Sequence, residues 1–151
     1  MIIKKHHSWN LDYKIAIELQ KELLKEVILR DRFKSIGKIA EVDVRFLKEL
    51  NKFVCAALIF SYPSLEIIKE KYFQSEPHFP YIPGLLSLRE GPVVERCFEQ
   101  IKNIPDLAFF DGHGYSHPRR LGLASHMGII LNLPSLVAQR KNFADSMMIY
   151  L

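Results

Sequence analysis

The spacing of apolar residues near the N-terminus predicts a helix. Over residues 10–29, apolar side chains recur at every fourth position, while lysine and glutamate fill the opposite face. Asn10 stands where a helix needs a capping side chain. The apolar stripe consists of Leu11, Ile15, Leu19, Leu23 and Val27. We therefore expect a helix that begins after Asn10 and packs through this stripe.

Three segments that follow alternate in the manner of strands. They cover residues 38–47, 52–63 and 65–77. In the first of them, every second residue from Ala40 shares one face, and Asp43 belongs to the other face. The links between the segments are short, which favours antiparallel neighbours. The pattern predicts a three-stranded meander.

After a proline-rich turn at residues 79–84, helical and strand patterns alternate. The expected elements are a helix over 87–102, a strand over 105–112, a helix over 119–132 and the start of a strand over 133–139. Pro92 is expected in or near the first turn of its helix. Strands that alternate with helices pair in parallel. The fold class is therefore α/β, with a mixed sheet of three antiparallel strands followed by parallel strands and with flanking helices.

Composition sets the broad class of the protein. The chain of 151 residues is long enough for one domain with a single core. Hydrophobic residues make up 48% and charged residues 25%, which is typical of a globular fold. The net charge of +4 permits a polyanionic partner without requiring one.

The cysteines and the N-terminus bear on the compartment. Cys55 and Cys97 lie in apolar runs and are expected to be buried thiols, which fits a reducing cytoplasm. The first residues lack an apolar signal core, and the apolar run at 53–60 is too short to cross a bilayer. His6 and His7 precede the first helix, and we expect them on the surface.

Three carboxylates stand at positions that suggest chemistry. Asp43 lies within a strand, Glu90 enters a helix beside the proline-rich turn, and Asp111 ends a buried strand. Each could instead form a salt bridge or cap a helix. Together, hard oxygen ligands on adjacent elements suit Mg²⁺, which polarises a phosphodiester and activates water. The three acids are therefore candidate metal ligands.

The loop DGHGYSHPRR (111–120) adds features of anion binding. Gly112 and Gly114 allow backbone amides to approach a phosphate, and Arg119 is expected at the mouth of a helix, where anions are favoured. We place His117 with Arg119 on the nucleic-acid side of this loop. His113 and His117 do not match a zinc spacing.

The turn FPYIPG has two interpretations. Prolines beside an aromatic residue often form a packed turn. Alternatively, Pro80 and Pro83 restrict Tyr81 and Ile82 so that a rigid apolar tip can enter a base stack and fill the gap of an extruded nucleotide.

Several long blocks of sequence carry a family resemblance. They are VDVRF (42–46), SYPSLEI (61–67), FPYIPGLLSLREGP (79–92), PDLAFFDGHGYSHPRRLGLASHMGI (105–129) and LNLPS (131–135). Over nearly all of residues 6–135 the chain resembles the endonuclease V family, the deoxyinosine 3′ endonucleases of DNA repair. The resemblance implies an RNase H-like fold. It also implies Mg²⁺-dependent hydrolysis, with Mn²⁺ as a substitute, of the second phosphodiester bond 3′ to a deaminated base, typically hypoxanthine.

The resemblance also assigns residues. Asp43, Glu90 and Asp111 fall on the family's catalytic, metal-binding acids, and Tyr81 falls on its strand-separating aromatic. The residues near the family's pocket for the flipped base are Gly112, Gly114, Gly122, Ser125 and His126. The expected partner is DNA with deaminated bases, or RNA with inosine. We expect the protein to be a monomer and not to bind a membrane.

The sequence departs from the family pattern after about Ser135. Family chains continue with a glycine and then VAK, whereas this chain reads LPSLVAQRK, with Gln139 at the expected lysine and Lys141 nearby. The family also continues with further strands, an active-site histidine and a closing helix, which this sequence lacks. We therefore expect one domain over residues 1–151 that is incomplete at its C-terminus, and a frameshift or premature stop is our hypothesis for the cause.

These observations leave several functions open. The first is a Mg²⁺-dependent endonuclease for deoxyinosine. The second is a catalytically impaired module that binds inosine-containing nucleic acid, and a third is an inosine-specific endoribonuclease. A poorly folded fragment is a further alternative.

Overall fold

The computed structural model describes residues 1, 3, 5–31, 33–138 and 149–150, and Gln139 and Lys141 lie outside them. The elements are α1 (Tyr13–Leu24), β1 (Lys38–Leu47), β2 (Lys52–Ser61), β3 (Ile67–Ser75), α2 (Leu86–Glu99), β4 (Leu107–Asp111), α3 (Leu123–Leu131), β5 (Ser135–Ala138) and β6 (Ile149–Tyr150). A short 3₁₀ turn, Lys48–Leu50, joins β1 to β2. None of the helices in the described residues has the length and apolar character needed to cross a lipid bilayer.

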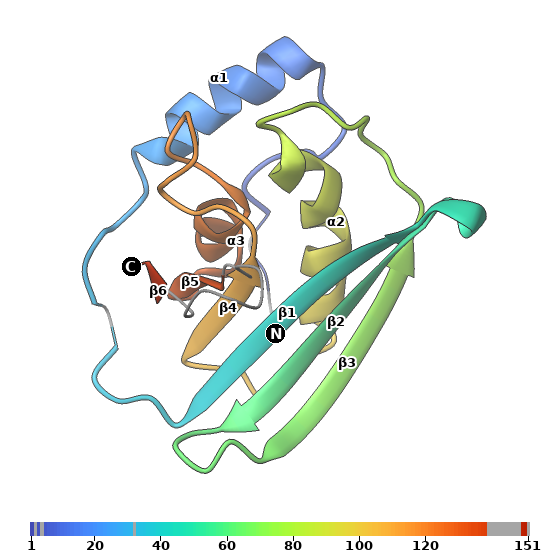
Figure 1. Cartoon of the computed structure of the whole chain (residues 1–151). Coiled ribbons are helices and arrows are strands. Elements are labelled where there is room, and N and C mark those ends of the chain that lie inside the picture. The colour runs from blue at the N-terminus through green and yellow to red at the C-terminus, as the bar shows by residue number, and fades with distance from the viewer. Residues whose placement is uncertain (2, 4, 32, 139–148, 151) are drawn as a thin grey trace, which may run out of the picture.

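One mixed sheet carries all the strands, in the order β3-β2-β1-β4-β5-β6 (Figure 1). The pairs β1–β2 and β2–β3 are antiparallel, which confirms the predicted meander. The pairs β1–β4 and β4–β5 are parallel, and β6 returns antiparallel to β5. The predicted mixed α/β sheet is therefore confirmed. Its centre is the parallel pair β1–β4, at the switch from the antiparallel half.

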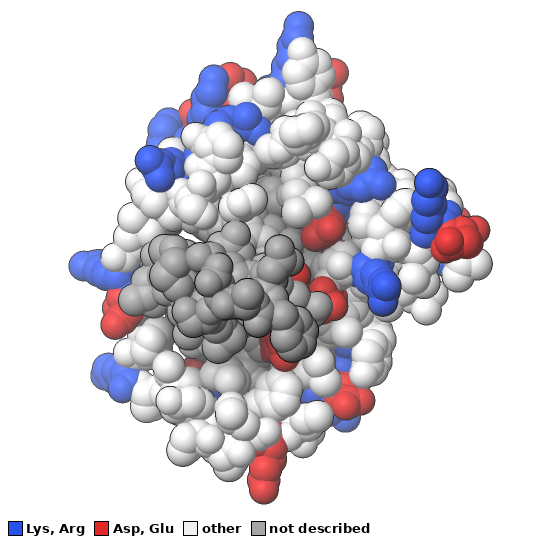
Figure 2. Space-filling model, in the orientation of Figure 1, with Lys and Arg blue, Asp and Glu red and all other residues white. Residues whose placement is uncertain are grey.

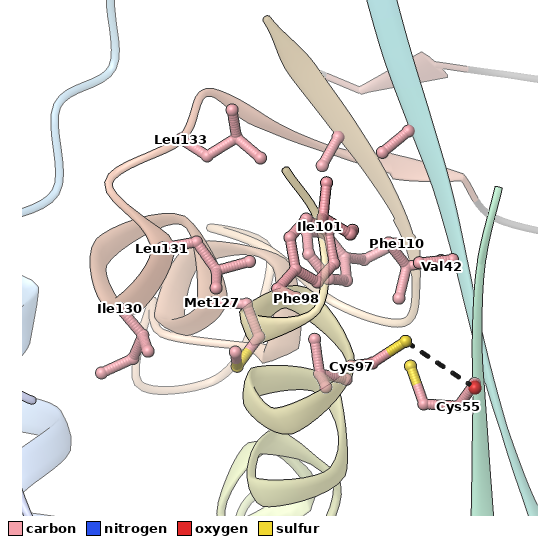
Figure 3. Close-up of a cluster of buried hydrophobic side chains, with 14 of the residues drawn as sticks. Val42, Cys55, Cys97, Phe98, Ile101, Phe110, Met127, Ile130, Leu131 and Leu133 are labelled. Carbon is pink, nitrogen blue, oxygen red and sulfur yellow. Dashed lines mark hydrogen bonds between the residues drawn. The ribbon is translucent and has the colours of Figure 1, made fainter. Parts of the chain in front are cut away.

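The core lies between the sheet and the helices α2 and α3, which pack side by side behind it (Figure 1). Phe98 of α2 stacks on Phe110 of β4 with ring centroids 6.5 Å apart, and Met127 of α3 belongs to the same buried cluster (Figure 3). Cys55 and Cys97 lie in this cluster as free thiols, as predicted, and the Cys97 thiol points at the Cys55 carbonyl oxygen. This core anchors the strands that carry the candidate acids.

The first helix differs from its prediction. It begins later, because Asp12 rather than Asn10 caps it: the Asp12 carboxylate accepts the Lys14 amide at 2.9 Å. The buried side of α1 is formed by Ala16, Gln20 and Leu23. Ile15, expected in the packed stripe, is 58% exposed. The small Ala16 allows close packing, and Gln20 is buried because the neighbouring loops supply its hydrogen-bond partners.

Two helix starts also differ from prediction. Helix α2 begins at Leu86, so Pro92 lies inside the helix and beyond its first turn. Helix α3 begins at Leu123, with Gly122 as its N-cap, rather than near residue 119. The preceding residues form tight turns instead: the Arg120 amide bonds the His117 carbonyl, and Arg120 has a φ of 60°. Arg119 therefore does not stand at a helix mouth.

Candidate active site

A pocket of about 230 Å³ gathers the three predicted acids. Asp43 comes from β1, Glu90 from α2 and Asp111 from the end of β4. Apolar residues of the core and Gly112 complete its walls. On the face of Figure 2, acidic side chains gather near the centre with basic side chains beside them. Residues separated by up to 68 positions thus share one hollow, as predicted for a joint site.

Sheet register explains why the acids meet. Val42 of β1 lies opposite Phe110 of β4 in the parallel pair. The next residue on each strand is Asp43 and Asp111, so these carboxylates leave neighbouring strands at the same level. Asp111 ends β4, and ligand sites of open α/β sheets form at the carboxyl ends of strands, beside a switch in strand order. Helix α2 then brings Glu90 over this edge.

The three carboxylates are electrostatically coupled. Burial, together with the negative charges of Asp111 and Asp43, raises the pKa of Glu90 to about 7 against the opposite influence of Arg89. Glu90 is half-buried, so water relieves this crowding only in part. A cation in the pocket would neutralise the repulsion.

The donor set determines which metal the pocket suits. Among the described residues, no three His, Cys, Asp or Glu side chains converge closely enough to cage a metal ion. Three carboxylates around one open pocket nevertheless fit Mg²⁺ or Mn²⁺, because such hard ions take few protein ligands and keep several waters. A set of carboxylates without any His or Cys ligand is unlike the zinc sites of proteins. The residues present therefore fit an open, oxygen-lined site.

The predicted tip stands clear of the surface. Tyr81 is 68% exposed, and Pro80 and Pro83 beside it are also exposed. Ile82 instead turns inward and packs, half-buried, on a small core that contains Phe79. The base of the turn is thus packed, as the first interpretation predicted, while its aromatic tip is exposed to solvent.

The glycines of the predicted anion loop have different roles. Gly112 lines the acid pocket and has a φ of 141°, which favours glycine. Gly114 and Gly122 are buried, and a Cβ on Gly122 would lie 2.2 Å from the His113 carbonyl oxygen. A Cβ on Gly114 would lie 2.9 Å from Val137. Close packing inside the loop explains these two glycines.

His117 and Arg119, predicted on the nucleic-acid side of the loop, make hydrogen bonds within the protein. The His117 Nε2–H donates to the Gly84 carbonyl at 2.9 Å, while Nδ1 accepts the Arg119 amide at 3.0 Å. The Arg119 guanidinium donates to Gln20 Oε1 at 2.6 Å and to the Gly84 carbonyl at 2.8 Å. Both side chains therefore tie loops together, because these buried partners outcompete solvent.

His126 is fully buried and belongs to a hydrogen-bonded chain. Its Nδ1 lies 2.9 Å from the Ser87 hydroxyl, and its Nε2 lies 2.8 Å from His7 Nε2. His7 Nδ1 donates to the Ser8 carbonyl, so His7 Nε2 accepts, His126 Nε2–H donates and the Ser87 hydroxyl donates to His126 Nδ1. Burial lowers the pKa of His126 to about 3.

Sequence reasoning missed this role of His7. It is half-buried and bonded to His126, whereas we expected it on the surface. Trp9 belongs to the same strap: its indole N–H donates to the Glu95 carboxylate. The residues 7–9 thereby fasten the N-terminus to α2 and α3. The Trp9 ring also packs against Gly91 of α2: a Cβ on Gly91 would lie only 2.3 Å from that ring. In the sequence, the single tryptophan close to two histidines was the feature that could have indicated this packed segment.

Ser125 lies away from the acids. It is half-buried on α3 and lines a second, larger hollow of about 740 Å³ between α3 and residues 26–30. The structure thus brings together Asp43, Glu90, Asp111 and Gly112, with Tyr81 on a separate exposed turn. It does not bring Ser125 or His126 into that pocket.

Comparison with known proteins identifies relatives of this chain. The family model described as Endonuclease V matches residues 21–148. Endonuclease V of Dictyoglomus turgidum is 48% identical over 82% of this chain and 54% of its own length. That of Gloeobacter violaceus is 43% identical over 86% of this chain and 54% of its own. The chain thus spans roughly half the length of these curated relatives.

Solved structures give the same result for the fold. The crystal structure of the endonuclease V of Streptomyces avermitilis has a TM-score of 0.83 at 35% identity, covering 92% of this chain and 62% of that one. The human endonuclease V has a TM-score of 0.79 at 24% identity, covering 86% and 60%. These similarities confirm the predicted RNase H-like sheet.

Proposed function

This chain belongs to the endonuclease V family, and from that premise we propose that it recognises deaminated bases in nucleic acid and hydrolyses the strand beside them. The observation that carries the proposal is the pocket shared by Asp43, Glu90 and Asp111. These three acids match the family's catalytic positions, and their charges are coupled. The proposed substrate is DNA that contains deoxyinosine, cut at the second phosphodiester bond 3′ to the lesion.

Asp43, Glu90 and Asp111 are the residues that would hold Mg²⁺ or Mn²⁺. When bound, such an ion polarises a phosphodiester and lowers the pKa of a water that can attack phosphorus. With a pKa near 7, the Glu90 carboxyl often carries a proton at neutral pH, and it must lose that proton to act as a charged ligand. Asp43 and Asp111 lie on neighbouring strands at one level, and there they would orient the strand to be cut.

Tyr81 would act on the base stack. Its ring is exposed at the end of a stiff turn, so it can enter a duplex at a low cost in conformational entropy. The loop that starts at Gly112 would border the pocket for the extruded base, and the packed glycines Gly114 and Gly122 would shape that loop from inside. His126 and Ser125 would support the α3 end of this region.

A monomer suffices for the proposed activity, because the acids and the tip are all on one chain. The two free, buried cysteines fit a reducing compartment such as the cytoplasm. One alternative function has an observation in its favour. The chain spans 54% of the length of its Dictyoglomus turgidum relative, so it could bind inosine-containing strands without cutting them.

Cleavage assays with three labelled strands test the proposal. One carries deoxyinosine in DNA and one carries inosine in RNA. The third is DNA with inosine followed by a ribo-adenosine, because the endonuclease V of Ciona intestinalis was crystallised with such a DNA. We expect Mg²⁺-dependent cutting one nucleotide beyond the inosine, none with EDTA and none without inosine.

The strand that is cut fastest assigns the substrate as DNA or RNA. Retention of the inosine strand in a binding assay without any product would instead support the binding function. Equal cutting of strands with and without inosine would contradict the proposal.

A further inference from the structure

The carbonyl oxygen of Gly84 is a meeting point for three segments of the chain. It accepts hydrogen bonds from Gln20 Nε2 at 2.9 Å, His117 Nε2 at 2.9 Å and Arg119 Nη2 at 2.8 Å. A carbonyl oxygen has two lone pairs, so three donors on one oxygen are an unusual concentration. Gly84 ends the turn that carries Tyr81.

Gln20 is the organising residue of this cluster. It is fully buried on α1, and both polar atoms of its side chain form hydrogen bonds. Oε1 accepts from Arg119 Nε at 2.6 Å, and Nε2 also donates to the Leu121 carbonyl at 3.3 Å. A buried amide is costly unless it is bonded in this way. Gln20 therefore links α1, the turn at Gly84 and the loop before α3.

The close approach depends on glycine. Gly84 has a φ of 81°, and a Cβ at this position would lie 2.6 Å from Arg119 Nη2. A side chain there would both strain the backbone and displace the guanidinium from the carbonyl. The turn and Arg119 are thus fitted to each other.

The other end of the turn is fixed as well. Arg89 donates to the Phe79 carbonyl at 3.0 Å, and its guanidinium lies over the rings of Phe46 and Phe53. Phe79 and Leu85 on either side of the turn are buried. Only the middle of the turn projects into solvent, with Tyr81 at its tip.

We propose that Gln20, together with His117 and Arg119, is a positioning clamp that holds the Gly84 end of the turn and so aims Tyr81 at a nucleic-acid duplex. This inference rests on the proposed function of Tyr81. A tip held at both ends has already lost the freedom that binding would otherwise have to remove. None of the three clamp residues needs to touch the substrate, so they act through Tyr81.

The clamp has a consequence that a purely structural role lacks. Entry of Tyr81 into a base stack is needed for duplex substrates and not for a single strand. Loss of the clamp should therefore lower cleavage of an inosine duplex about tenfold relative to an inosine single strand, as for the loss of one or two buried hydrogen bonds. Cleavage of the single strand should change little.

The test compares Gln20→Met with Leu23→Ala on the same helix. Gln20→Met keeps the side-chain volume and removes the hydrogen bonds to Gly84. Leu23→Ala is the control, because Leu23 is also buried on α1 but forms no hydrogen bond to Gly84. Native-state hydrogen exchange of the amides of Tyr81, Ile82, Gly84 and Leu85 reports on the turn without any substrate. We expect exchange there to be about tenfold faster in Gln20→Met than in Leu23→Ala.

A second variant keeps the test decisive if Gln20→Met fails to fold. Gly84→Ala leaves Gln20 in place and pushes Arg119 from the carbonyl, so it should also accelerate exchange over 81–85. Equal exchange in the clamp variants and Leu23→Ala would overturn the clamp.

The two levels of the inference fail separately. A parent chain that cuts neither duplex nor single strand would sink the proposed function, while the exchange data would still decide whether the clamp exists. If the parent is active and Gln20→Met keeps the parental ratio of duplex to single-strand cleavage, the role of the clamp in aiming Tyr81 is wrong.

Discussion

Glu90, one of the three acids around the pocket, has a clearly raised pKa. Burial and the charges of Asp111 and Asp43 raise its pKa to about 7 from an ordinary value of 4.5. A carboxyl group whose pKa is raised by folding stabilises the protein fully below its unfolded pKa. That contribution is lost as the pH rises through the folded value. Without a metal, ionised Glu90 therefore weakens the fold at alkaline pH.

We predict that Glu90→Gln stabilises the metal-free protein at pH 8 by about 1–3 kcal/mol, because it removes the third negative charge. Urea unfolding in EDTA measures this free energy, and the difference should shrink at pH 5. Glu41→Gln, on the same strand as Asp43 and exposed, is the matched control and should change little. An unchanged or lower stability of Glu90→Gln at pH 8 would show that the acids are not coupled.

Among single residues, the sequence predicted where the acids lie, but it did not predict the hydrogen-bond partners of His117 and Arg119. Asp43 and Asp111 could be placed because strand periodicity fixes where a residue leaves the sheet. Arg119 and His117 could not be placed, because a long side chain in a loop points to whichever buried partner the fold supplies. Here those partners are Gln20 and the Gly84 carbonyl, far away in the sequence.

The N-terminal strap shows how an element can depend on one buried histidine. His126 joins the strap to α2 through His7 and Ser87, and its pKa is lowered to about 3. A histidine with a depressed pKa is neutral in the fold. Below about pH 6.5 the unfolded chain binds the proton more tightly, so stability falls as the pH drops toward 3.

We predict that the unfolding free energy falls less steeply between pH 6.5 and 5 in His126→Gln than in the parent. The difference between the two slopes should approach about 1.4 kcal/mol per pH unit. Glutamine keeps a donor toward His7 and does not titrate. Denaturant titrations across this range measure the slope. Identical slopes in the two proteins would mean that His126 is not held neutral by the fold.

Sequence periodicity identified α1 to α3 and β1 to β5 but not β6, and the predicted buried side of α1 was wrong. The apolar stripe counted Ile15, whereas the structure buries Ala16 and Gln20. Pattern alone cannot favour a glutamine in a core, because only the tertiary partners of its amide make that burial possible. The late start of α3 has a similar cause, since the residues before Gly122 are committed to turns.

The whole molecule is organised around the switch from antiparallel to parallel pairing. Alternating helices and strands predicted the parallel half, and short links predicted the meander; both are confirmed. The register of β1 against β4 could not be predicted from the sequence. It nevertheless determines the geometry of the site, because it brings Asp43 level with Asp111.

We propose that the pocket of Asp43, Glu90 and Asp111 cuts inosine-containing strands. The most direct measurement is the single-turnover cleavage rate of Asp43→Asn on an inosine duplex with Mg²⁺, beside the parent and Glu41→Gln. Loss of one charged ligand should lower the rate at least about a hundredfold while most binding remains, and Glu41→Gln should match the parent. Cleavage by Asp43→Asn at the parental rate would contradict the account.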